Sequence, residues 1–111
     1  MSRAKFSFKD FEPSETLRTT SNQALERILD AAPSDSMAVA RLTKRIGGYE
    51  ALFEVFSHSG QFTARTFEAD AESALNFAAS QMMSRLEAWK LSRFEGANPD
   101  DGFLQAANER A

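Results

Sequence analysis

Residues 37–94 decide the fold, and they read MAVARLTKRIGGYEALFEVFSHSGQFTARTFEADAESALNFAASQMMSRLEAWKLSRF. The stretch divides into three strand-like runs joined by glycine-containing turns, followed by one long amphipathic pattern. Gly47-Gly48 and Ser59-Gly60 are both typical of two-residue hairpin loops. The three runs therefore predict an antiparallel β-meander.

The charges of the meander give a test of its register. With these two loops, Arg45 faces Glu50 and Arg41 faces Glu54 in the first hairpin, and Arg65 faces Glu54 in the second. Opposite charges on neighbouring strands stabilise a sheet, whereas a slip of one residue moves every side chain to the other face. The sequence thus predicts one cross-strand row, Arg41–Glu54–Arg65, on the open face of the sheet.

The other face of the meander is apolar or small and must be covered. Its predicted members are Ala38, Ala40, Leu42, Ile46, Tyr49, Ala51, Phe53, Val55, Phe62, Ala64 and Thr66. Asp70 is a favourable N-cap for a covering helix that begins at Ala71 and is stopped by Gly96 and Pro99. The apolar stripe of that helix consists of Ala71, Leu75, Ala78, Met82, Leu86 and Trp89.

Before the meander, residues 5–11 predict a strand, with Phe6 and Phe8 on one face. A helix is then predicted from Pro13-Ser14 to about Asp30. A helix between two strands makes a right-handed crossover, so those strands should be parallel. We therefore predict an α+β fold of order β-α-β-β-β-α, a four-stranded sheet with both helices packed on one face.

The chain has 111 residues, of which 42% are hydrophobic, and a formal net charge of −3. These values predict a single globular domain, residues 1–96, followed by a short acidic and flexible tail, residues 97–111. There is no cysteine, no apolar run of the roughly 20 residues that cross a bilayer, and no apolar segment typical of a secretory signal. We expect a cytoplasmic protein with no membrane contact.

The sequence offers little for catalysis. His58 is the single histidine, and it lies in a predicted turn with only Ser57 and Ser59 as polar neighbours, without an orienting acid nearby in the sequence. One histidine without cysteine also makes a dedicated metal site unfavourable. We predict no enzyme activity, no catalytic residues, no metal and no cofactor.

The order of elements and their motifs resemble those of the ribosome hibernation-promoting factors, also called ribosome-associated inhibitors. The matching pieces are Phe6-Ser-Phe, Ser14-Glu-Thr-Leu-Arg18, Phe62-Thr-Ala-Arg-Thr-Phe-Glu-Ala-Asp70, Ala74-Leu75 and Arg85-Leu86. The resemblance covers roughly residues 5–94. It implies non-catalytic binding to ribosomal RNA of the small subunit and inhibition of translation under stress, through basic residues on the helices and neighbouring strands.

The bases that match this implied role are Arg18, Arg27, Lys44, Arg85, Lys90 and Arg93. Lys and Arg also line ordinary solvated helix rims, with their stems over the core, so a surface role is the alternative for this group.

A different class of function is also open. Four apolar residues are predicted on the open sheet face, namely Val39, Leu52, Phe56 and Phe67. Exposed apolar residues framed by charge can mark a protein contact. The alternative is therefore a homodimer, or a protein-interaction module, that acts through this face.

Overall fold

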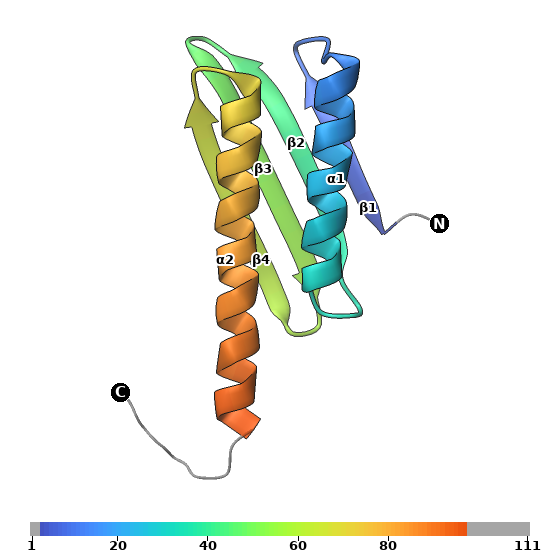
Figure 1. Cartoon of the computed structure of the whole chain (residues 1–111), viewed down its shortest axis with the longest axis vertical. Coiled ribbons are helices and arrows are strands. Elements are labelled where there is room, and N and C mark those ends of the chain that lie inside the picture. Colours follow the sequence, from blue (N-terminus) through green and yellow to red (C-terminus); the bar gives the residue numbers. More distant parts are fainter. Residues whose placement is uncertain (1–2, 98–111) are drawn as a thin grey trace.

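The computed structural model describes residues 3–97, with side chains through Ser92. The elements follow the predicted order and are shown in Figure 1. They are β1 (Ala4–Lys9), α1 (Glu15–Ala31), β2 (Met37–Arg45), β3 (Gly48–Ser57), β4 (Gly60–Glu68) and α2 (Ala71–Ala97). The described helices contain no segment that is both long and apolar enough to cross a membrane.

The four strands form one sheet in the order β1-β2-β3-β4. β1 pairs with β2 in parallel, and the two meander pairs are antiparallel. Both helices lie on the same face of this sheet and begin at the same end of it (Figure 1). The predicted α+β fold, with its crossover and its open sheet face, is confirmed.

Both helix starts are set by the predicted caps. The Ser14 hydroxyl accepts a hydrogen bond from the Leu17 backbone N–H at 3.1 Å, and the Asp70 carboxylate accepts one from the Ser73 N–H at 2.8 Å. These bonds satisfy N–H groups that the first helical turn leaves without partners. β1 is shorter than predicted, because Asp10 has a φ of 70° and takes the chain out of the strand.

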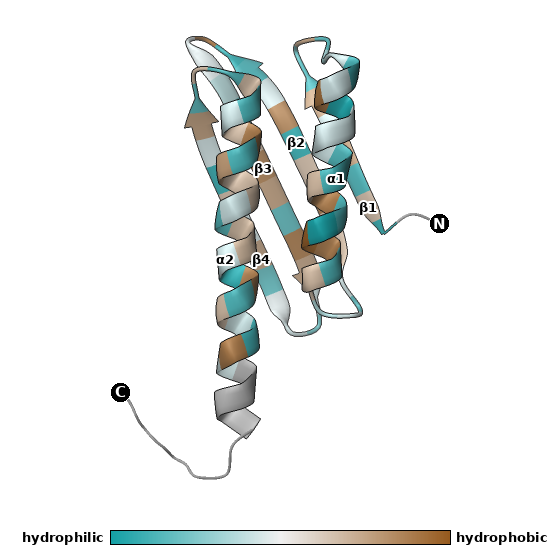
Figure 2. Cartoon of the chain, viewed as in Figure 1, coloured by the Kyte–Doolittle hydropathy of each residue, from teal (hydrophilic) through white to brown (hydrophobic). Residues whose placement is uncertain are grey.

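The core lies between the sheet and the two helices, and Figure 2 shows hydrophobic positions alternating with hydrophilic ones along the strands. Its fully buried large side chains are Phe53, Ile28, Leu42, Leu75, Met82, Leu86 and Val55. Phe6 from β1 meets Phe53 edge to face, with ring centroids 5.7 Å apart. The predicted assignment of Phe53 to the covered face is confirmed.

The predicted register of the meander is wrong by two residues in both hairpins. The loops are Ile46-Gly47 and His58-Ser59, since Arg45 pairs with Gly48 and Ser57 pairs with Gly60. The predicted row therefore does not exist.

Arg41 and Arg65 both lie opposite Leu52, whereas Glu54 lies between Val39 and Thr63. A shift of two residues keeps every side chain on its predicted face, because side chains alternate with a period of two. Glu54 accordingly still points away from the helices.

Two features of the strands explain the observed register. Phe53 lies opposite Ala40 on one side and Ala64 on the other, so that a large ring fits between two small residues. The predicted register would have put Phe53 opposite Leu42 instead.

Gly48 is the second feature. A Cβ on this residue would lie 2.3 Å from the Glu68 carbonyl oxygen, so the position in the strand is restricted to glycine. Gly47 takes the turn, with a φ of 87°.

One further residue differs from the prediction, and one region is not tested. Ile46 was expected on the covered face, but it lies in the β2–β3 loop with its side chain fully exposed. The predicted stop at Pro99 and most of the predicted acidic tail fall in residues 98–111, which lie outside the described part of the chain.

Candidate nucleic-acid interface

The helix cations differ in how strongly the protein itself engages them. Arg27, Arg85 and Lys90 are exposed on α1 and α2. Arg18, by contrast, donates to the Glu12 carboxylate at 3.2 Å and lies over the Phe8 ring, 5.6 Å from its centroid. Its guanidinium thus already has a partner, whereas the other three form no ion pair with the described residues and can contact a phosphate from the helix rims.

The predicted set of six bases does not form one cluster. Lys44 lies at the β2–β3 turn, where its amine stands 4.9 Å from the centroid of the Tyr49 ring. Arg85 and Lys90 flank Trp89, whose ring meets Phe62 near the start of β4. Those two places are opposite ends of the sheet, because Tyr49 pairs with the last residue of β4. Arg93 belongs to α2, but its side chain lies outside the described residues.

The four apolar interface candidates all lie on the open sheet face. Val39 is 38% exposed, Phe56 is 41% exposed and Phe67 is 51% exposed, whereas Leu52 is partly buried. Met37, 55% exposed and directly opposite Phe56, enlarges this group and was not singled out from the sequence. Leu52 and Val39 line a small depression of about 110 Å³ on the same face.

Glu50 is the centre of the charge network on this face. Its carboxylate lies 2.7 Å from the Arg45 guanidinium on β2 and 3.3 Å from that of Arg65 on β4. Both partners are diagonal neighbours rather than directly opposite residues. The predicted Arg45–Glu50 pair is thus present, although the residues do not occupy the predicted register positions.

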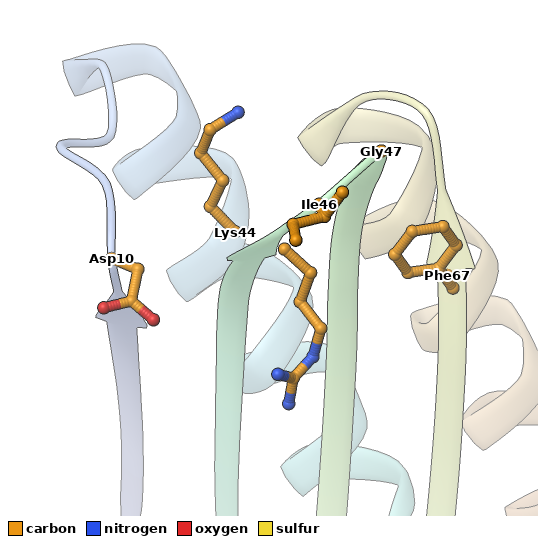
Figure 3. Close-up of a pocket in the computed structure, with 6 residues that line it drawn as sticks. Asp10, Lys44, Ile46, Gly47 and Phe67 are labelled. Carbon is orange, nitrogen blue, oxygen red and sulfur yellow. The ribbon is translucent and has the colours of Figure 1, made fainter.

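A hollow of about 740 Å³ lies at the β2–β3 end of the sheet. Figure 3 shows Asp10 and Phe67 on its two sides, with Ile46 and Gly47 at the hairpin tip between them. The Phe67 ring is held close to Gly48, since a Cβ there would lie 3.0 Å from the end of the ring. The hollow therefore combines an apolar wall with the cations of the turn.

His58 has a structural role at the opposite end of the sheet. Its backbone N–H donates to the Asp35 carboxylate at 2.8 Å, which ties the β3–β4 turn to the loop before β2. This hydrogen bond lowers the pKa of Asp35, against the smaller opposing effect of burial. The Ser57 hydroxyl donates to the Gly60 carbonyl at 3.0 Å and stabilises the turn.

The comparisons with known proteins give a fold and no sequence family. No protein-family model matches the sequence, and no curated protein matches it either. Among solved structures, the N-terminal domain of Thermus thermophilus Protein Y is similar, with a TM-score of 0.66 and 19% identity, over 80% of this chain and 99% of that one.

A ribosomal subunit interface protein from Coxiella burnetii is also similar, with a TM-score of 0.66 and 13% identity, over 79% of this chain and 97% of that one. Nearly the whole of each solved chain is thus superimposed on this one. The fold of this protein is the fold of these two structures, as the resemblance in the sequence implied.

Proposed function

We propose that this protein is a non-catalytic ribosome-binding protein, which associates with the small subunit and inhibits translation under stress. The observation that carries the proposal is the likeness to two ribosome-related structures over 99% and 97% of their lengths, with both helices on one face of a four-stranded sheet. The resemblance in the sequence motifs supports the same function independently.

In this proposal, basic side chains on the helix side of the protein contact ribosomal RNA. Arg27, Arg85 and Lys90 are exposed, and Arg85 and Lys90 lie five residues apart on α2. Each lysine or arginine that neutralises a phosphate contributes to the affinity for RNA, and this contribution decreases as the salt concentration rises. Only a few such bases are present, so we expect modest affinity that is lost at high salt.

Sedimentation of the purified protein with separated small and large ribosomal subunits tests this function. We expect the protein to pellet with small subunits at about 50 mM salt and to be released by about 200 mM. The Arg85→Glu/Lys90→Glu variant should pellet less than the wild type. Absence of pelleting with small subunits at the lowest salt would refute the proposal.

The alternative of a homodimer or protein module needs the open sheet face to meet a second protein surface. The exposed Phe56 and Phe67 side chains favour it. Light scattering gives the mass in solution, and a dimer mass that falls to a monomer in Phe56→Glu would support this alternative over ribosome binding.

A further inference from the structure

Positive charge in this protein is concentrated on the open sheet face, opposite the helices. The face carries five bases and two acids, namely Lys5, Lys9, Arg41, Arg45, Arg65, Glu50 and Glu54. The rest of residues 3–92 carries six bases and ten acids. A chain with a net charge of −3 thus presents one face with a net charge of +3.

Three of these bases are available to a ligand. Glu50 holds Arg45 and Arg65, whereas Lys5, Lys9 and Arg41 are exposed and form no ion pair with any other described residue. Lys5 and Lys9 lie on β1, and Arg41 lies on β2 opposite Ser7, between them along the strand. The three cations therefore form a compact triangle at the β1 side of the face.

Exposed aromatic rings lie at both ends of the same face. Phe56 pairs with Met37 and Gln61 at one end, and Phe67 pairs with Glu50 toward the other. Phe67 is 51% exposed, and the end of its ring lies close to Gly48. Aromatic rings beside lysine and arginine side chains suit single-stranded nucleic acid. The nucleobases of any sequence can stack on the rings while the phosphates contact the cations.

We propose that the open sheet face is a second RNA-binding surface, which binds a single-stranded segment through Lys5, Lys9 and Arg41 and through stacking on Phe67. The choice of RNA as the polyanion rests on the proposed function. A second copy of the chain fits this face less well, because two surfaces of the same positive charge would face each other. The protein would then contact RNA from both sides, through the open sheet face and through the helices.

Fluorescence anisotropy with a labelled single-stranded RNA of about 12 nucleotides tests this surface directly. We expect Lys9→Glu/Arg41→Glu to bind at least about tenfold more weakly than the wild type. The slope of log affinity against log salt should also fall by about 1.4, since two phosphate contacts are lost at about 0.7 each.

The matched control is Arg85→Glu/Lys90→Glu, which makes the same change in net charge on the helix side. We expect it to weaken binding of the oligonucleotide by less than about threefold, because its charges act only through the screened field. Lys9→Gln/Arg41→Gln provides a milder variant if the double reversal disturbs folding, and circular dichroism checks each variant for folding.

Three results would overturn the inference. The first is an equal loss of oligonucleotide binding in Lys9→Glu/Arg41→Glu and Arg85→Glu/Lys90→Glu. The second is no binding of the oligonucleotide by the wild type. The third is a dimer that Phe56→Glu dissociates while substitution of Lys9 and Arg41 has no effect.

Sedimentation distinguishes a failure of this inference from a failure of the proposed function. If the wild type pellets with small subunits but the two double reversals lose oligonucleotide binding equally, only the sheet surface is refuted. If the wild type binds the oligonucleotide through Lys9 and Arg41 but does not pellet, only the ribosome function is refuted.

Discussion

The two faces of the sheet are built from the same strands, but different interactions determine how side chains pair on each face. On the covered face, Phe53 fits between Ala40 and Ala64, so the volumes of neighbouring side chains determine which residues pair. On the open face, Glu50 reaches diagonally to both of its arginine partners. Packing in the core is intolerant of changes in volume, whereas long charged side chains adjust to the register that the core selects. Charge pairing in this sheet therefore follows the strand register and does not set it.

The largest expected effect is the loss of the Phe53 ring. Phe53→Ala should lower the free energy of unfolding by about 3–5 kcal/mol, because it leaves a cavity under the helices. Phe56→Ala, the same change three residues along the strand but on the open face, should cost about 1 kcal/mol or less. Urea unfolding of both variants measures the difference. Equal costs in a monomer would show that the two faces are not distinct in the way described.

A smaller loss is expected from Gly48→Ala. The new methyl group would meet the Glu68 carbonyl oxygen, and β3 and β4 would have to separate there. Overpacking of this kind costs about 1–3 kcal/mol. The control is Gly47→Asn, one residue away, where nothing lies within 4 Å of the added Cβ and the positive φ is tolerated by Asn. If thermal melts rank the two variants in the reverse order, then the glycine in the strand is not what fixes the register.

The smallest effect distinguishes the observed charge network from the predicted row. Glu50→Gln should lower stability by about 0.5–1 kcal/mol, and less at high salt, because two partly exposed ion pairs are lost. Glu54→Gln should have almost no effect, since Glu54 forms no ion pair with the described residues. A double-mutant cycle should find coupling of Arg65 to Glu50 and none to Glu54. Coupling of Arg65 to Glu54 instead would restore the register predicted from the sequence.

Most of the fold could be predicted from local chemistry. Ser14 and Asp70 are N-cap residues that indicate where the helices begin. The alternation of apolar and polar residues along the strands assigns each side chain to its face of the sheet. The register could not be predicted, because Gly47-Gly48 suits a hairpin loop in isolation. Only the contact with the Glu68 carbonyl, from a neighbouring strand, shows that Gly48 belongs to β3.

The candidate site was predicted less completely than the fold. The helix bases and the open-face apolar residues could be named from the sequence, and the latter were placed on the correct face. Lys5 and Lys9 were missed as contributors, although their alternation with Phe6 and Phe8 was visible. Their relation to Arg41 depends on the parallel pairing of β1 with β2, which joins distant parts of the chain.

That parallel pairing also has a consequence for the order of assembly. Ala4 pairs with Ala38, and the whole of α1 lies between them, whereas the meander is closed by two-residue loops. Local hairpins form faster than pairings that must close a long loop. β1 is therefore synthesised before the other three strands of this sheet but is not the first that can pair, and it must wait for α1 and β2 to emerge. Before β1 pairs with it, β2 has an open edge, and Lys5 and Lys9 are not yet part of the open sheet face.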